Sequence, residues 1–232
     1  MAQYLITGAN RGLGLEFVRQ LLARGDRVIA ACRHTARASE LNQFSGEYPG
    51  RLKVLPLEVA DPRSIAELAR EVAMLELRID VLINNAGVLT SGETFGEVEA
   101  KALSQAFATN AQGPFLLTQA LATQLADKAR VVAISSGLGS IERTKRFGTP
   151  SYNISKAALN MAVRLLGHAL AEREIAVLAL SPGWVKTDMG GENADLDVSQ
   201  SVSNMLKVID ALVFDPEAIG QFLGNGGDPL PW

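Results

Sequence analysis

Short apolar segments alternate with longer amphipathic segments along almost the whole chain of 232 residues. Strands that alternate with helices form βαβ units, whose right-handed crossovers build a parallel sheet with helices on both faces. The pattern predicts an α/β fold: a single doubly wound domain over residues 1–232, with a mostly parallel sheet of about seven strands. The expected strands are Gln3–Thr7, Arg27–Ala31, Leu52–Leu57, Val81–Asn84, Val131–Ser135, Ile175–Leu180 and Gln221–Leu223. The expected helices are Leu13–Arg24, Ala36–Phe44, Pro62–Leu77, Val98–Ala126, Ser151–Glu172 and Val198–Val213.

Composition excludes several classes of protein. A hydrophobic fraction of 47% and a charged fraction of 20% are ordinary for a soluble globular domain. The net charge of −3 argues against a nucleic-acid partner, and the short basic run at residues 143–146 is read as a solvated loop face. One cysteine, Cys32, and two histidines exclude an internal disulfide and argue against a metal site. No apolar run reaches the ~18 residues of a membrane span, so we expect a cytoplasmic protein without a membrane partner.

A glycine-rich turn joins the first strand to the first helix. Its glycines are Gly8, Gly12 and Gly14, in the spacing G-x-x-x-G-x-G, and the residues between them include Asn10, Arg11 and Leu13. Such a turn lets the backbone approach a pyrophosphate, which the free N–H groups of the helix N-terminus can bind. A structural turn that merely tolerates glycine is the alternative, and the place directly after the first strand argues against it. The turn predicts a dinucleotide site.

The end of the second strand indicates which dinucleotide binds. A carboxylate there would hold the ribose 2′-hydroxyl of NAD, but the strand ends in Ala31-Cys32-Arg33-His34. Arg33 is placed to meet a 2′-phosphate, and Arg11 of the glycine turn could reach the same group. The alternative is that Arg33 is simply an exposed charge. Two cations without a carboxylate favour NADP(H) over NAD(H) as the cofactor.

Tyr152 and Lys156 lie four residues apart in the predicted helix Ser151–Glu172, so they share one face. A neighbouring ammonium favours the tyrosinate and lowers the pKa of the phenol, which suits a general acid or base. Taken alone, a Tyr and a Lys at this spacing are more often exposed surface residues without a catalytic role. Ser135 and Ser136 end the fifth predicted strand, where ligands bind in open α/β sheets, and strand alternation allows only one of them to face the cleft.

Taken together, these residues resemble the short-chain dehydrogenase/reductase family, whose members have a Rossmann-type fold. The matching segments are Thr7–Gly14, Asn84-Asn85-Ala86-Gly87, Asn110, Ser136, Tyr152-Asn153-Ile154-Ser155-Lys156 and Pro182–Thr187, in family order. Their spacing and the ending Asp228–Trp232 look most like the carbonyl-reductase-like branch that includes the sniffer and C-factor proteins.

The resemblance implies a role for each matching residue. Tyr152 would be the catalytic acid or base, Lys156 would lower its pKa and bind the nicotinamide ribose, Ser136 would polarise the substrate carbonyl, and Asn110 would hold a helix geometry and a water. The implied cofactor contacts are Gly8, Asn10, Arg11, Gly12, Leu13, Gly14, Arg33, Glu58, Val59, Asn85, Ala86, Gly87, Tyr152, Lys156, Pro182, Gly183, Val185 and Thr187. Glu58 departs from the family's usual Asp, which puts its adenine contact in doubt, although the Val59 backbone could still serve.

The expected function is NADPH-dependent reduction of a carbonyl (aldehyde, ketone or quinone) to an alcohol, or the reverse. The partners would be a small carbonyl or alcohol substrate and, as is common in the family, further copies of the chain in a dimer or tetramer. The alternative is a C-factor-like signalling or regulatory protein that binds NAD(P)(H) with incidental turnover. A serine hydrolase is disfavoured because the chain has no G-x-S-x-G elbow. Residues 137–150 would form an extended loop at the substrate mouth, and Met189–Asn193 a mobile lid.

Overall fold

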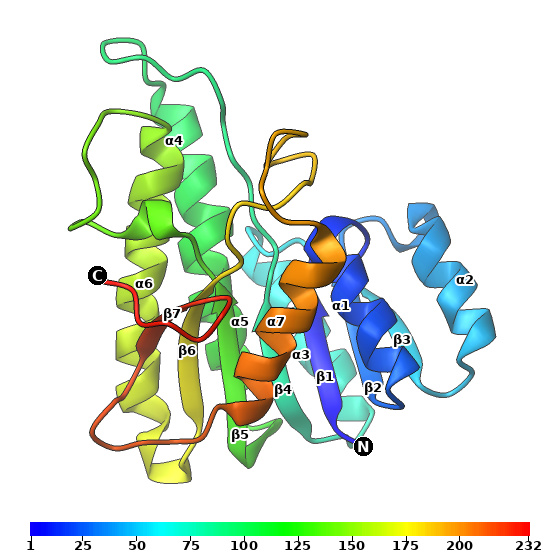
Figure 1. The fold of residues 1–232 in the computed structure, drawn as a ribbon. Coiled ribbons are helices and arrows are strands. Elements are labelled where there is room, and N and C mark those ends of the chain that lie inside the picture. Colours follow the sequence, from blue (N-terminus) through cyan, green and yellow to red (C-terminus); the bar gives the residue numbers. More distant parts are fainter.

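The computed structural model describes all residues from 1 to 232, and a seven-stranded parallel sheet forms its centre (Figure 1). The strands follow the order β3-β2-β1-β4-β5-β6-β7, so the direction of winding reverses between β1 and β4. The strands are β1 (Gln3–Thr7), β2 (Arg27–Cys32), β3 (Leu52–Pro56), β4 (Ile79–Asn84), β5 (Leu125–Ile134), β6 (Ala176–Ser181) and β7 (Gln221–Gly224). The predicted doubly wound α/β fold is confirmed, including the short last strand.

Seven α-helices cover the two faces of the sheet. They are α1 (Gly12–Ala23), α2 (Ser39–Glu47), α3 (Pro62–Met74), α4 (Ala100–Phe107), α5 (Gly113–Ala120), α6 (Pro150–Leu170) and α7 (Val198–Ala211). Local signals explain some of their ends: α3 begins after Asp61, whose carboxylate accepts a hydrogen bond from the Arg63 N–H at 2.9 Å, and Pro62 occupies the first helical position.

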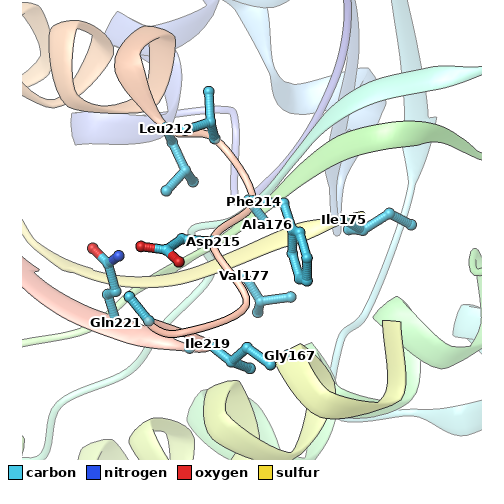
Figure 2. Close-up of a pocket in the computed structure, with 12 residues that line it drawn as sticks. Gly167, Ile175, Ala176, Val177, Leu212, Phe214, Asp215, Ile219 and Gln221 are labelled. Atoms are coloured by element: carbon cyan, nitrogen blue, oxygen red, sulfur yellow. The ribbon is translucent and has the colours of Figure 1, made fainter. Parts of the chain in front are cut away.

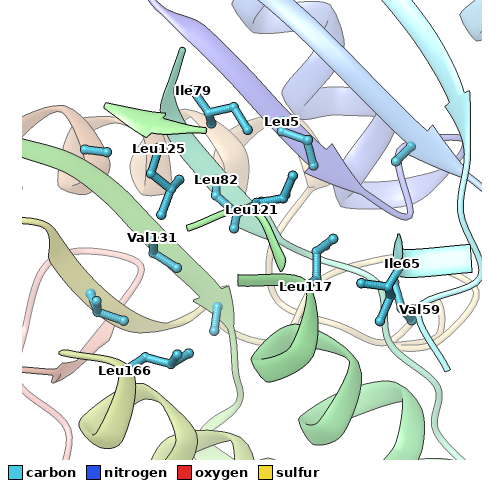
Figure 3. Packing of buried hydrophobic residues seen from close by; sticks show 14 of the residues in the cluster. Leu5, Val59, Ile65, Ile79, Leu82, Leu117, Leu121, Leu125, Val131 and Leu166 are labelled. Atoms are coloured by element: carbon cyan, nitrogen blue, oxygen red, sulfur yellow. The ribbon is translucent and has the colours of Figure 1, made fainter. Parts of the chain in front are cut away.

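Alternation along the strands divides the core into two layers. In β1, Leu5 belongs to the layer beneath α3, α5 and α6, whereas Tyr4 and Ile6 belong to the layer beneath α1, α2 and α7. Figure 3 shows the first layer, in which Leu5 and Leu82 of the sheet pack with Leu117 of α5 and nearby apolar side chains. Because both faces of the sheet are covered, the central strands β1 and β6 are buried along their whole length and read as largely apolar runs, which is the signal that the sequence carries.

The helix predicted over Val98–Ala126 is helical only from Ala100 to Ala120, and it contains an irregular turn. The chain forms α4, then a π-helical turn at Ala108–Gln112, then α5, and it enters β5 at Leu125. Pro114, at the start of α5, has no N–H to donate to the preceding turn. Asn110 lies within the π-helical turn, which is wider than an α-helical one. Leu125 pairs with Ile79 and is fully buried, so tertiary packing draws this residue into the sheet rather than into a helix.

The other predicted helices differ from the structure at their boundaries. The segment predicted as Ala36–Phe44 begins with a 3₁₀ turn at Thr35–Arg37, and its α-helix runs from Ser39 to Glu47. The predicted Ser151–Glu172 ends as an α-helix at Leu170 and continues as a 3₁₀ turn. None of the helices combines the length and the apolar character that crossing a membrane requires.

Candidate active site

Four neighbouring strands deliver most of the candidate residues to one edge of the sheet. β1, β4, β5 and β6 are parallel neighbours, and the segments that follow their carboxyl ends gather at the top of Figure 1. The reversal of winding between β1 and β4 lies at the same edge, and open α/β sheets bind ligands at such a point.

The glycine turn packs too tightly for larger residues at two positions. Gly8 has a φ of +62°, and a β-carbon there would lie 2.9 Å from the Ala86 Cα. A β-carbon on Gly14 would lie 2.2 Å from the Gly8 carbonyl oxygen. These glycines bring α1 close to β1 and to the segment after β4. No side chain caps the N-terminus of α1, so its backbone N–H groups can meet an anion.

The segment after β4 fixes the glycine turn by side-chain hydrogen bonds. Asn85 Nδ2 donates to the carbonyls of Thr7 and Gly8 at 2.9 and 3.2 Å. The Thr7 hydroxyl accepts from the backbone N–H groups of Asn85 and Ala86, each at 3.0 Å. Sequence reasoning singled out Asn85 and Ala86 but gave Thr7 no role of its own, because its partners lie more than seventy residues away.

The two predicted phosphate-binding arginines each have a carboxylate partner. Arg11 Nη1 lies 3.0 Å from Asp188 Oδ2, in an ion pair between well-exposed side chains. Arg33 Nη1 lies 3.7 Å from Glu58 Oε2, at the ends of the adjacent strands β2 and β3. The structure therefore places Glu58 against Arg33. Val59 is buried, and its carbonyl packs against Gly113 of α5.

Two further residues predicted in the glycine turn differ in exposure. Asn10 is exposed, whereas Leu13 is half-buried in the first turn of α1 and packs on the core layer beneath that helix. Leu13 therefore contributes a packing contact as well as a backbone N–H at the helix N-terminus.

The structure separates the two serines at the end of β5. Ser135 is buried, and its hydroxyl donates to Asn160 Oδ1 at 2.7 Å. Ser136 Oγ accepts from the Leu138 N–H at 3.1 Å, and its hydroxyl lies close enough to Tyr152 to offset part of the rise in the phenol pKa that burial causes. Of the two candidates, Ser136 is therefore the serine that lies beside the tyrosine, in agreement with the alternation of side chains along a strand.

Tyr152 and Lys156 lie on one face of α6, and both are buried. Burial raises the pKa of the Tyr152 phenol, and Ser136 offsets this only in part. The sequence predicted a lowered pKa from Lys156, and the structure differs. Desolvation lowers the pKa of Lys156 to about 8. The Lys156 Nζ donates to the Ile134 carbonyl at 2.7 Å and lies 5.6 Å from the centre of the Tyr152 ring.

Asn110 joins the π-helical turn to the segment after β4. Its Oδ1 accepts from the Val88 N–H at 2.8 Å, and its Nδ2 donates to the Val88 carbonyl at 2.8 Å and to the Ser155 hydroxyl at 2.9 Å. The Ser155 hydroxyl donates in turn to the Tyr152 carbonyl at 2.7 Å. A β-carbon on Gly87 would lie 3.4 Å from Asn110 Oδ1 and 3.8 Å from Lys156 Nζ, so these three residues meet.

The loop after β6 is held together by its own backbone. Leu196 donates its N–H to the Trp184 carbonyl at 3.0 Å, and the Lys186 N–H donates to the Leu196 carbonyl at 2.9 Å. Thr187 Oγ1 donates to the Val185 carbonyl at 3.3 Å and accepts from the Gly190 N–H at 3.1 Å. The segment predicted as a lid therefore begins in an ordered turn.

Three predicted residues anchor this loop at the sheet edge. Pro182 accepts a hydrogen bond on its carbonyl from the Ser201 hydroxyl of α7 at 2.7 Å. Gly183 has a φ of +81° and packs on Leu196. A β-carbon placed on Gly12 would lie 3.7 Å from Thr187 Cγ2. The loop thus lies directly across from the glycine turn.

One crevice lies away from this edge of the sheet. This small crevice between α6 and the loop from α7 to β7 lies at the start of β6, beside Ile175 and Phe214 (Figure 2). Its volume of about 10 Å³ is the space of a single water, which is too little for a cofactor. No three His, Cys, Asp or Glu side chains come together as they would around a metal ion.

Comparison with known proteins agrees with this geometry. The family model described as short chain dehydrogenase matches residues 3–197. The chain is 42% identical over 156 residues to the C-signal protein of Myxococcus xanthus, covering 66% of this chain and 93% of that protein.

Solved structures extend the likeness to the whole chain. An NADPH-bound carbonyl reductase from chicken fatty liver superimposes with a TM-score of 0.93 at 38% identity, covering 100% of this chain and 94% of that one. The carbonyl reductase Sniffer of D. melanogaster gives a TM-score of 0.93 at 30% identity, covering 100% of both chains. The chain belongs to the short-chain dehydrogenase/reductase family, and its likeness to the sniffer and C-signal proteins confirms the branch that the sequence indicated.

Proposed function

We propose that the protein is an NADP(H)-dependent oxidoreductase that reduces a small-molecule carbonyl to an alcohol or catalyses the reverse reaction. The observation that carries this proposal is the cluster at the sheet edge: a buried Tyr152 beside the Ser136 hydroxyl, with the Lys156 ammonium 5.6 Å from its ring. The likeness to an NADPH-bound carbonyl reductase over the whole chain supports the same reaction class.

The residues at this edge fit an NADP(H) molecule. The backbone cradle of Gly8, Gly12 and Gly14 would hold the pyrophosphate at the uncapped N-terminus of α1. Arg33 and Arg11 would meet the 2′-phosphate, for which each would exchange its present carboxylate partner. The remaining proposed contacts are Asn10, Leu13, Glu58, Val59, Asn85, Ala86, Gly87, Pro182, Gly183, Val185 and Thr187. When bound, NADPH supplies the hydride that the carbonyl carbon receives.

The side chains of the chain itself handle the proton. Ser136 donates a hydrogen bond to the substrate oxygen and orients it toward Tyr152. Tyr152 then transfers its phenolic proton to that oxygen, and the ammonium of Lys156 stabilises the phenolate that remains. Lys156 would also bind the nicotinamide ribose of the cofactor, and Asn110 would keep the π-helical turn and a water in place for reprotonation. In the oxidative direction, Tyr152 accepts the alcohol proton instead.

A turnover screen tests the proposal. Benzaldehyde, acetophenone and naphthoquinone represent aldehydes, ketones and quinones, each tried with NADPH and with NADH. We expect NADPH-dependent reduction in at least one class and loss of most turnover in Tyr152→Phe, which keeps the ring but lacks the proton. Turnover by Tyr152→Phe near the wild-type kcat would refute the role of this residue, and a wholly inactive wild type would refute the reaction class.

A second candidate function is signalling or regulation through cofactor binding. The 42% identity to the C-signal protein favours this alternative, because it covers most of that relative. The intact set of Asn110, Ser136, Tyr152 and Lys156 favours the enzyme. Complementation in a cell that lacks the protein separates the two: a regulator keeps its effect in Tyr152→Phe, whereas an enzyme loses it.

Self-association is part of the proposal. Phe107 of α4 and Ile154, Met161 and Leu165 of α6 are large apolar side chains that remain exposed, and the three in α6 share one face. A second copy of the chain would cover this surface and form a dimer. Sedimentation of the wild type and of Met161→Lys tests it, with the variant expected to shift toward the monomer.

Residues 1–232 are proposed to form one domain, so the substrate meets only loops at the sheet edge. One loop covers residues 137–150 and the other residues 186–204. Half-exposed apolar side chains of these loops and of the segment before them would line the substrate: Leu138, Trp184 and Met189.

A further inference from the structure

A side chain from another part of the chain caps the helix that carries Tyr152. Glu93, in the segment after β4, accepts two hydrogen bonds on its Oε2: one from the Ser151 hydroxyl at 2.8 Å and one from the Ser151 backbone N–H at 3.3 Å. Ser151 is the second residue of α6 and directly precedes Tyr152. Glu93 therefore holds the catalytic helix one residue away from the phenol.

The helix lacks the cap that its own sequence offers. Thr149 occupies the N-cap position, where a threonine oxygen normally accepts an N–H from the first turn. Its φ of 41° is left-handed, and its hydroxyl donates to Asn153 Oδ1 at 3.1 Å instead. Pro150 has no N–H to satisfy. Glu93 thus caps the N-terminus of α6 in place of Thr149.

The capping carboxylate is held at an energetic cost. Glu93 Oε1 is buried without a hydrogen-bond partner, and Ser151 is almost completely buried. Burial of an unpaired carboxylate oxygen is unfavourable, although the positive end of the helix dipole partly compensates for it. Buried polar atoms without a protein partner are uncommon in folded proteins, so this carboxylate is an unusual feature of the loop.

The segment that carries Glu93 makes further contacts around the start of α6. Val88 binds Asn110, which reaches the Tyr152 carbonyl through Ser155. Phe95 packs edge-on against Phe147, just before α6, with ring centroids 5.6 Å apart. Contacts on either side of Glu93 therefore tie its segment to the residues around the start of α6.

We infer that Glu93 is a positioning residue for the proposed reaction. It fixes the first turn of α6 and with it the place of the Tyr152 hydroxyl relative to Ser136. This inference rests on the proposed function, since positioning matters only if Tyr152 transfers a proton. Glu93 itself touches neither Tyr152 nor Ser136 through a hydrogen bond and acts through Ser151.

Three variants test the inference in the full chain. Glu93→Ala removes the cap, Glu93→Gln keeps an oxygen that can accept from Ser151, and Glu97→Ala removes a carboxylate of the same loop that binds only Thr94. For the carbonyl probe that the wild type turns over, we expect Glu93→Ala to lower kcat about 10- to 100-fold. The Kd for NADPH should stay unchanged, and Glu93→Gln should recover most of the lost kcat.

Hydrogen exchange supplies a readout that does not depend on turnover. Amides at the start of α6, residues 151–153, should exchange faster in Glu93→Ala than in the wild type or Glu93→Gln, while the rest of α6 is unchanged. Unaltered exchange or unaltered kcat in Glu93→Ala would overturn the inference, as would equal kcat losses in Glu93→Ala and Glu93→Gln. An inactive wild type with the expected exchange pattern would refute the proposed function but leave the cap established.

Discussion

The ammonium of Lys156 lies 5.6 Å from the centre of the Tyr152 ring and donates to the Ile134 carbonyl at 2.7 Å. This hydrogen bond does not make up for the loss of water around a fully buried cation, because the pKa of Lys156 falls from 10.5 to about 8. The folded state therefore holds its proton less tightly than the unfolded state does, and the charged form of this residue opposes folding.

We predict that the stability cost of Lys156 depends on pH. Between about pH 8 and 10.5 the unfolded chain binds more protons at this residue, so the free energy of unfolding rises with pH. Below about pH 8 the cost is fully present, at roughly 3 kcal/mol. The stability of Lys156→Met relative to wild type should therefore fall by about that amount as the pH rises through this range.

Chemical denaturation from pH 7 to 10.5 measures this difference. The exposed Lys145 is the matched control, and Lys145→Met should keep a constant difference from wild type. The same pH dependence in wild type and Lys156→Met would contradict the assignment of this titration to Lys156.

The contact between Arg33 and Glu58 predicts a second result. A carboxylate 3.7 Å from Arg33 competes with a 2′-phosphate, so Glu58→Gln should tighten NADPH binding by up to about fivefold. Arg33→Ala should weaken it about 10- to 100-fold through loss of a charge-assisted hydrogen bond. Neither variant should change the Kd for NADH, which lacks the phosphate.

Titration calorimetry with both cofactors tests this pair. Arg70 of α3, whose guanidinium bonds its own helix at Ala66, is a control whose replacement by Ala should change neither Kd. Weaker NADPH binding in Glu58→Gln would contradict this competition and would show that the charge of Glu58 helps to hold the cofactor.

Replacement of glycine by alanine should have opposite effects on the free energy of unfolding at two helical positions, Gly14 in α1 and Gly46 in α2. In Gly14→Ala the new carbon would lie 2.2 Å from the Gly8 carbonyl oxygen and 2.6 Å from Asn85 Nδ2. We expect a loss of about 1–3 kcal/mol in the free energy of unfolding and weaker NADPH binding. In Gly46→Ala, inside α2, nothing lies within 4 Å, so this control should be stabilised by about 0.5–1 kcal/mol. Urea denaturation of both variants decides the matter, and equal effects would contradict the packing described for Gly14.

The sequence predicted those features that depend on neighbours in the chain. Apolar runs located the strands, the glycine spacing located the turn before α1, and the interval between Tyr152 and Lys156 placed both on one helical face. Contacts between distant segments were missed. Asp188 pairs with Arg11 across 177 residues, and Glu93 reaches Ser151 across 58. Nothing local marks either carboxylate.

One missed feature did leave a local signal. Pro114 inside the predicted helix Val98–Ala126 indicates an irregularity, since proline has no N–H to donate to the preceding turn. The irregularity is a π-helical turn that contains Asn110, whose bond to Val88 apolar periodicity cannot predict. The family resemblance gave Asn110 a role, and the structure supplies the contacts behind it.

The two hydrogen bonds between Asn110 and Val88 predict that Asn110→Ala loses more activity than its loss of stability explains. In Asn110→Ala, two partly buried backbone groups of Val88 lose their partner, which should cost roughly 1–3 kcal/mol. The Ser155 hydroxyl also loses its donor, so the turn of α6 between Tyr152 and Lys156 is less well fixed, and kcat should fall at least about tenfold at temperatures where the variant remains folded. Thr118→Val is the matched control, because it removes a buried hydrogen bond to Asn84 without touching α6. Thermal unfolding and steady-state kinetics should show both variants destabilised but only Asn110→Ala impaired in kcat, and an equal loss of kcat in Thr118→Val would reduce Asn110 to a general stabiliser of the fold.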